Sequence, residues 1–176
     1  MENDYYTAID ELKSKDETGA GFVGDVSQFN CSCMYGFIAI DMGDLIRNAK
    51  GHDEAIKALN LFFNAFMRSH PSGKQHSMAS MPLPAFMMVN VWDNGMIYSL
   101  ADAFANPVRS INGNIISKSI ENLIDYYKKT MFYVDEDDLL NTSIAILDDN
   151  IDLKDLNQYK AKNYKEIVEK TIKAVS

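Results

Sequence analysis

The sequence predicts an α+β fold, and two patterns carry this prediction. Stretches with apolar residues at three- and four-residue spacing are typical of amphipathic helices, and they are separated by shorter segments rich in β-branched and aromatic residues. A chain of 176 residues is also long enough to bury a core of its own. The longest apolar run, residues 81–91, is interrupted by Pro82, Pro84 and Asn90, so it is too short for a membrane span and we expect no membrane partner.

Two strands are predicted in the first part of the chain. Residues 5–9 are aromatic and β-branched, and residues 29–41 place their odd positions on one apolar face. Between them, residues 13–24 contain three glycines and four charged side chains, which predicts a mobile loop. Cys31 and Cys33 lie on the apolar face of the second strand, and a C-x-C pair without further ligands is a weak metal signal. We expect buried free thiols and no metal.

The middle of the chain reads as helix, loop, strand, turn and strand. Asp53 is a plausible N-cap for a helix that ends near Ser69, because Pro71 disfavours helical geometry at the residue before it. Residues 85–92 are strand-like, and Asp93-Asn94-Gly95 suits a tight hairpin turn into a second apolar run. This order predicts the second half of a ferredoxin-like or RNA-recognition-motif (RRM-like) sheet, which we call the palm.

Two further helices are predicted, at residues 116–133 and 163–174, because each shows one apolar stripe. The acidic stretch between them, residues 135–152, predicts a solvated connector. The expected divisions are residues 1–28 as a thumb-like hairpin and loop, 29–134 as the palm portion, and 135–176 as the acidic connector with the C-terminal helix.

The net charge of −8 argues against simple nucleic-acid binding, which usually needs a basic surface. Half of this excess is local, because residues 135–176 contain ten acids and six bases. Any RNA contact must therefore come from a few well-placed cations. The N-terminus lacks the basic and apolar regions of a signal peptide, so we expect a cytoplasmic protein.

The loop at residues 72–77 is the best candidate for a contact with phosphate. It has a glycine for close backbone approach, followed by three side chains that can donate hydrogen bonds: Lys74, Gln75 and His76. It is not a Walker loop, since Arg68 stands where that motif needs a glycine, five residues before Gly73, and Gln75 follows the lysine in place of Ser or Thr. On the residues alone, an ordinary solvated loop explains it better than a phosphate contact does.

A longer pattern gives these segments a common interpretation. The stretches DYYTAIDEL and GAGFVGDVSQFNCSCMYGFIAID, and later GKQHSMASMPLPAFMMVNVWDNGMIYSLADAFANPVR, occur in this order. Together they resemble the CasC-type backbone subunit (Cas-seven family) of the type I-E CRISPR surveillance complex, Cascade. The resemblance covers roughly residues 4–133 and falls on the second half of that family's chain. One departure is Gly36, where the family commonly has an arginine.

The resemblance implies a structural RNA-binding subunit with no enzymatic activity and no cofactor. Its expected partners are the CRISPR guide RNA, target DNA through base pairing with the guide, neighbouring copies of the same subunit and other Cascade subunits. The RNA-binding residues that it implies are Lys74, Gln75 and His76 in the palm loop and Tyr5, Tyr6, Thr7, Phe22 and Val23 in the thumb hairpin.

Two alternatives remain open from the sequence. A small metal-independent RNA-processing endonuclease on a ferredoxin-like fold would use His76 as a general acid or base. A protein-interaction module with no nucleic-acid role would fit the acidic charge balance.

Overall fold

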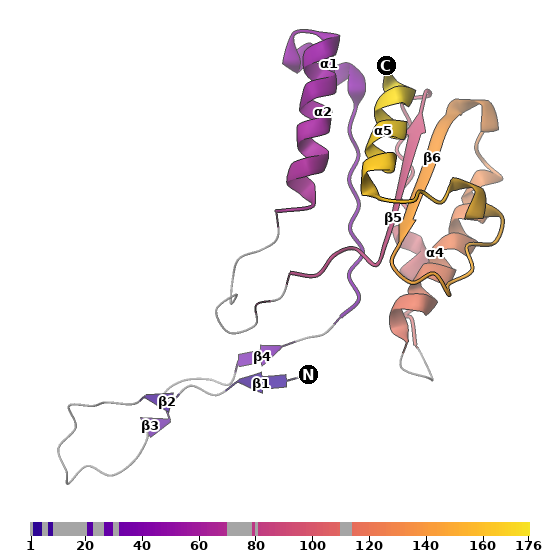
Figure 1. Ribbon diagram of the computed structural model, residues 1–176. Helices are drawn as coiled ribbons and strands as arrows, with labels where there is room; N and C mark the ends of the chain where they lie inside the picture. The colour runs from indigo at the N-terminus through magenta and orange to yellow at the C-terminus, as the bar shows by residue number, and fades with distance from the viewer. Residues whose placement is uncertain are drawn as a thin grey trace. The chain divides into compact units, whose positions relative to one another are not determined.

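The computed structural model describes residues 2–4, 7–8, 21–22, 27–29, 32–69, 79, 81–109 and 114–176, and the chain divides into two compact units, Met1–Met34 and Tyr35–Ser176. Figure 1 shows the helices and strands of the two units. The class is α+β, as predicted, and each unit has its own strand pairing.

The first unit contains two short antiparallel pairings. β1 (Glu2–Asp4) pairs with β4 (Ser27–Phe29), and β2 (Thr7–Ala8) pairs with β3 (Gly21–Phe22). In these registers Glu2 lies opposite Phe29 and Thr7 opposite Phe22. The described strands are therefore arranged as the two arms of an antiparallel hairpin. Residues 21–22 had been expected in a loop and instead form β3.

The second unit is built on one two-stranded antiparallel sheet. β5 (Phe86–Trp92) pairs with β6 (Leu139–Ile146), with Phe86 opposite Ile146 and a register shift between Val91 and Trp92. Two predictions are corrected here. The partner of β5 is not the run after residue 95, and β6 lies inside the stretch predicted as a solvated acidic connector.

The predicted turn at Asp93-Asn94-Gly95 forms, but it does not lead into a hairpin. Gly95 has a φ of 66°, which glycine adopts without strain, and the Asn94 side chain accepts a hydrogen bond from the Met96 N–H at 3.0 Å. The Asn94 amide also donates to Asp138 at 2.8 Å, just before β6. The turn thus joins the ends of β5 and β6, and the chain continues to the short helix η1 (Ala101–Phe104).

Two helices lie on opposite sides of this sheet (Figure 1). α4 (Ile115–Met131) packs on the face that carries Ile144, and Ile124 and Ile144 are both fully buried between them. α5 (Tyr164–Val175) contacts both strands and buries Ile167 completely. The inward stripes predicted for both helices are confirmed at Ile120, Leu123, Tyr127, Ile167 and Thr171.

A helical pair precedes the sheet in the chain. α1 (Met42–Ala49) is capped by Asp41, which accepts from the Asp44 N–H at 2.9 Å, and it was not predicted. α2 (His52–Phe66) matches the predicted helix but begins after Gly51, so Asp53 is not its N-cap. α2 packs against α5, where the Tyr164 hydroxyl donates to the Phe63 carbonyl at 2.7 Å.

Residues 32–41 differ from prediction. The apolar alternation predicts a long strand over residues 29–41, but residues 33–41 pair with no strand in the described part of the chain. In the second unit, Phe37, Ile38 and Ile40 are 45%, 51% and 39% exposed. Cys33 is a free, exposed thiol, so the expectation of burial is wrong for it. A strand needs a neighbour to bond with, and the described residues provide none beside this segment.

Candidate functional site

The predicted phosphate-binding residues Lys74, Gln75 and His76 lie outside the described residues. The structure describes the helix before them, α2, which ends at Phe66, and the strand after them, β5, which begins at Phe86. The helix and the strand expected on either side of these residues are therefore confirmed. The contact of these three side chains with phosphate stays a prediction.

The thumb residues are described only in part. Tyr5, Tyr6 and Val23 lie outside the described residues, whereas Thr7 and Phe22 are directly paired across β2 and β3. The structure therefore brings together one residue from each predicted arm. Their contact with RNA is not tested by this pairing.

The segment that departs from the family, around Gly36, leads from the first unit to α1. Tyr35 is anchored, because its hydroxyl accepts a hydrogen bond from the Leu100 N–H at 3.1 Å and its ring lies 5.3 Å from that of Phe104. Beside it, a Cβ atom added to Gly36 would meet nothing within 4 Å. The backbone there is open enough to carry a side chain that projects away from the protein.

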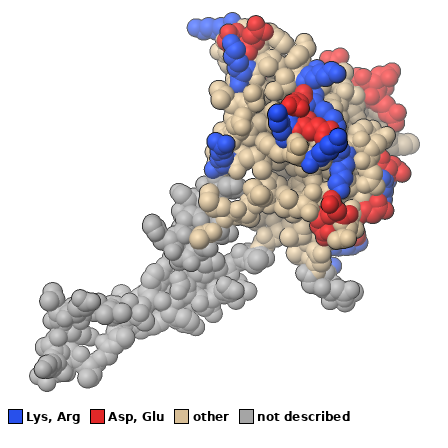
Figure 2. All heavy atoms as spheres, viewed as in Figure 1, with Lys and Arg blue, Asp and Glu red and all other residues tan. Residues whose placement is uncertain are grey.

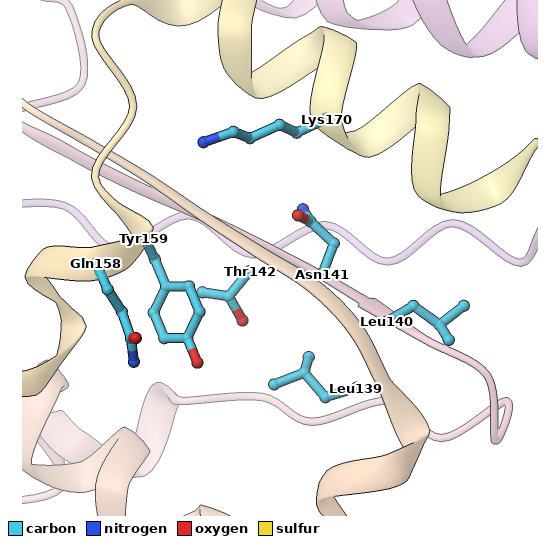
Figure 3. A pocket seen from close by; sticks show the side chains of 7 residues that line it. All are labelled: Leu139, Leu140, Asn141, Thr142, Gln158, Tyr159 and Lys170. Atoms are coloured by element: carbon cyan, nitrogen blue, oxygen red, sulfur yellow. The ribbon is translucent and has the colours of Figure 1, made fainter.

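A pocket of about 260 Å³ opens beside β6 (Figure 3). It forms where the short helix η3 (Lys154–Tyr159) meets β6, next to a single parallel bridge between Ile144 and Lys160. Its lining combines aliphatic, amide, hydroxyl and ammonium groups: Leu139, Leu140, Asn141, Thr142, Gln158, Tyr159 and Lys170. Sequence reasoning missed it because β6 itself was missed.

The polar groups of this pocket are largely satisfied within the protein. The Lys170 ammonium lies 2.8 Å from Glu166, and this lysine holds the pKa of the Glu166 carboxyl below its usual value. The Thr142 hydroxyl donates to Asn90 at 2.9 Å. The charged group of the lining, the Lys170 ammonium, is thus paired, and the pocket has room for a small polar group.

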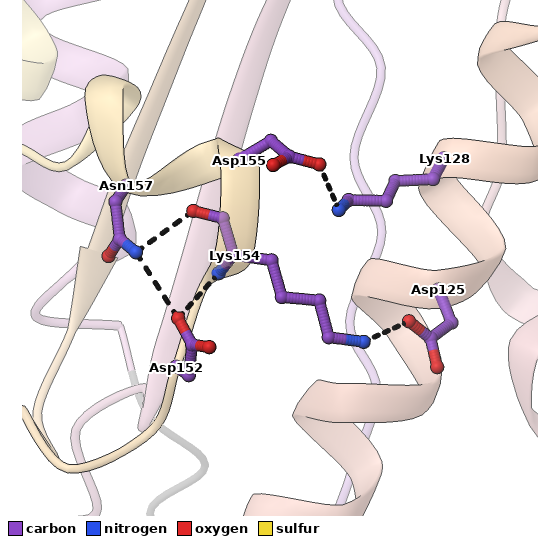
Figure 4. Close-up of polar contacts among 6 residues, drawn as sticks. All are labelled: Asp125, Lys128, Asp152, Lys154, Asp155 and Asn157. Carbon is purple, nitrogen blue, oxygen red and sulfur yellow. Dashed lines mark hydrogen bonds and ion pairs between the residues drawn. The ribbon is translucent and has the colours of Figure 1, made fainter.

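Four charged side chains hold η3 against α4 (Figure 4). Lys154 contacts Asp125 at 2.5 Å, and Lys128 contacts Asp155 at 2.6 Å. Each lysine lowers the pKa of its carboxylate partner, chiefly through the hydrogen bond, and Asp125 in turn raises the pKa of Lys154. This polar clamp fixes the helix that supplies Gln158 and Tyr159 to the pocket wall.

Lys154 occupies a backbone conformation that side chains rarely adopt, with a φ of 56°. The Asp152 carboxylate accepts from the Lys154 N–H at 2.8 Å, and the Asn157 amide donates to the Lys154 carbonyl at 2.9 Å. These local bonds hold the left-handed residue at the start of η3. The lysine side chain is thereby aimed at α4.

Within the described residues, no three histidine, cysteine or acidic side chains are close enough together to hold a metal ion. The His52 ring lies 3.3 Å from the carbonyl of Val175, and no carboxylate bond to it is seen in the described part of the chain. None of the described helices is both long and apolar enough to cross a bilayer.

Comparison with solved structures defines the class of the fold. A chain of a "CRISPR RNA-guided surveillance complex" matches with a TM-score of 0.87 and 24% identity, over 99% of this chain and 65% of that one. A chain of a "CRISPR RNA-guided surveillance complex, pre-nicking" matches with a TM-score of 0.77 and 20% identity, over 99% of this chain and 46% of that one. The protein thus shares the α+β fold of these subunits while spanning less than two thirds of their length.

The particular family follows from the sequence. The family model described as "CT1975-like protein" matches residues 1–173, and the chain belongs to this family. No curated protein matches the chain.

Proposed function

We propose that this protein is a structural subunit of an RNA-guided CRISPR surveillance complex, of the CasC backbone type found in type I-E systems. The observation that carries the proposal is the family match over residues 1–173, together with a fold that agrees with a surveillance-complex subunit over 99% of the chain. In this role the subunit binds guide RNA and leaves sequence recognition to base pairing between guide and target DNA.

The arrangement of the chain supports this role in two places. The antiparallel arms that pair Thr7 with Phe22 suit a hairpin that reaches over a strand of RNA and wedges between its bases. The loop carrying Lys74, Gln75 and His76 connects α2 to β5 and offers donors for phosphate. Neighbouring copies then stack head to tail along the guide and contact the other subunits of the complex.

We further propose that the subunit is not an enzyme. Its contribution is to hold and shape RNA, which needs neither a nucleophile nor a cofactor. With a net charge of −8, the chain alone should bind single-stranded RNA weakly and with a shallow salt dependence.

The test is assembly on guide RNA. The full chain would be produced with the remaining subunits of a surveillance complex and a guide, purified through a tag on this chain, and its RNA sequenced. We expect guide RNA to copurify. In the assembled complex, Lys74→Ala should reduce the magnitude of the salt slope of RNA binding by roughly 0.7, one phosphate contact.

The matched control is Lys57→Ala, which removes an exposed lysine from α2. Its salt slope should equal that of the unmodified protein. Copurification of no RNA, or of RNA without any guide sequence, would overturn the proposed function. Equal slopes for the Lys74 and Lys57 variants would remove Lys74 from the RNA-binding residues.

A further inference from the structure

The end of α4 carries two of the most exposed large side chains among the described residues. Phe132 and Tyr133 are 84% and 87% exposed, and their rings meet edge to face with centroids 5.2 Å apart. A single exposed aromatic residue needs no explanation, but an adjacent pair holding one geometry presents a raised apolar surface to solvent. Aromatic side chains of this kind contribute most of the binding energy at many protein interfaces.

An acidic turn follows this pair directly. Between Phe132 and Asn141 there are four acids and no base. Their combined charge of −4 is half of the net charge of −8. Three of these acids form the short helix η2 (Glu136–Asp138). Figure 2 shows acidic side chains gathered on the side of the molecule where Figure 1 places the connection from α4 to β6.

None of these four carboxylates has a cationic partner in the described part of the chain. Asp138 accepts from Asn94, and Asp135 accepts from the Asp137 N–H, but no ion pair is seen there for Glu136 or Asp137. Elsewhere on the same unit Asp125, Asp155 and Glu166 each contact a lysine. The acids beside the aromatic pair therefore project a net negative potential.

The same surface continues into the pocket beside β6. Leu139 and Leu140 follow the acidic turn and line the pocket, and Leu140 is 49% exposed. An aromatic ridge, a row of carboxylates and a recess of about 260 Å³ thus follow one another within residues 132–142. We call residues 132–142 the aromatic–acidic surface.

We propose that the aromatic–acidic surface binds an arginine- or lysine-rich segment of a protein partner. A guanidinium or ammonium group stacks favourably on an aromatic face, and carboxylates beside it supply the complementary charge. RNA is disfavoured, because its phosphates would face unpaired carboxylates. This inference goes beyond the proposed function and does not depend on it, since it uses only residues away from the predicted RNA-binding loop and thumb.

The test uses the full chain and a fluorescein-labelled peptide of nine arginines, with binding measured by fluorescence anisotropy at two salt concentrations. A peptide of nine glutamates and a single-stranded RNA oligonucleotide serve as competing probes. Phe132→Ala with Tyr133→Ala removes the aromatic ridge at unchanged charge, and Glu136→Gln with Asp137→Asn removes two charges at nearly unchanged shape.

The matched control is Asp53→Asn with Glu54→Gln, which removes two exposed acids from the first turn of α2. We expect the aromatic variant to bind the arginine peptide about tenfold more weakly, and the acidic variant about fivefold more weakly. The control should change affinity less than about twofold. Thermal midpoints should stay unchanged for the aromatic variant, because exposed rings contribute little to folding.

Three results would overturn the inference. The first is equal loss of arginine-peptide binding in the control and the acidic variant, which would indicate attraction to overall charge alone. The second is unaltered binding by the aromatic variant, or a large fall in its thermal midpoint, which would make the pair structural. The third is RNA binding that depends on Phe132 and Tyr133 more strongly than peptide binding does.

Discussion

The Lys154 ammonium lies 2.5 Å from a carboxylate oxygen of Asp125, and this contact joins η3 to the middle of α4. The lysine reaches α4 from a left-handed backbone position, so the ion pair and the strained conformation occur in one residue. Substitutions at residue 154 can separate the two effects.

We expect Lys154→Gly to be more stable than Lys154→Ala. Both variants lose the contact with Asp125, but only glycine adopts a φ of 56° without strain. The difference should be about 2–4 °C in thermal midpoint for a chain of this length. Differential scanning fluorimetry of the two variants measures it directly, and a higher midpoint for the alanine variant would show that the left-handed position carries no strain.

Acid should weaken the polar clamp and the separate Glu166–Lys170 pair. The lysine partners lower the pKa of Asp125 and Asp155 below the usual 3.8, and that of Glu166 below 4.5. A carboxyl with a lower pKa in the folded state stabilises the fold above its unfolded pKa, and this stability is lost as the pH falls through the folded pKa. The thermal midpoint should therefore fall as the pH drops below about 4.5.

The control for this pH dependence is the double variant Asp125→Asn with Asp155→Asn. Its thermal midpoint should fall less steeply over the same pH range. High salt should also flatten the profile of the unmodified protein, because these pairs are partly exposed. The raised pKa of Lys154 affects stability at alkaline pH. The charged lysine stabilises the folded state fully below pH 10.5, and this contribution is lost as the pH rises through its folded pKa. If the thermal midpoints of the unmodified protein and the double variant depend on acid pH identically, the polar clamp is not the cause of that dependence.

Ile144→Ala should destabilise the fold by about 2–5 kcal/mol, because this side chain is fully buried between β6 and α4. Leu147→Ala, three residues further on and 65% exposed, should change the free energy of unfolding by less than about 0.5 kcal/mol. Chemical denaturation of both variants tests whether β6 is a core strand. Equal and small changes in the free energy of unfolding for both variants would indicate that β6 is not a core strand but part of a solvated connector, as the sequence predicts.

Gly36→Arg should strengthen RNA binding in the assembled complex if the proposed function holds. The position has room for a side chain, and one added phosphate contact should steepen the salt slope by roughly 0.7. Gly36→Gln is the control, since it adds a long polar side chain without charge. An arginine variant that binds RNA no better than the glutamine variant would place residue 36 away from the guide.

The helices α2, α4 and α5 were predicted because their signal is local, whereas the short helix α1 was missed. The three- and four-residue spacing of Ile120, Leu123 and Tyr127 specifies one buried face of α4, and Asn163 is the N-cap of α5, accepting from the Glu166 N–H at 3.0 Å. These features depend on neighbours within one or two turns, so they can be read without knowing the fold.

Strand pairing was predicted poorly because it depends on distant residues. Val89 pairs with Ser143 across more than fifty positions, and the acids before and after β6 concealed a strand whose middle residues, 142–144, are all buried. The turn at Asn94 has hairpin chemistry, yet it bonds to Asp138 and not to a following strand. The pocket beside β6 could not be predicted without this pairing.

The segment from Tyr35 to Ile40, which pairs with no strand among the described residues, also has a practical consequence for solubility. Odd and even positions in this segment are both largely apolar, as in a strand that is buried on both faces. However, Phe37, Ile38 and Ile40 are exposed. Such a segment is a template on which another copy can add a strand, so concentrated solutions of the chain should aggregate through it. A polypeptide that pairs with residues 35–40 would act on this protein as a chaperone, keeping it dispersed.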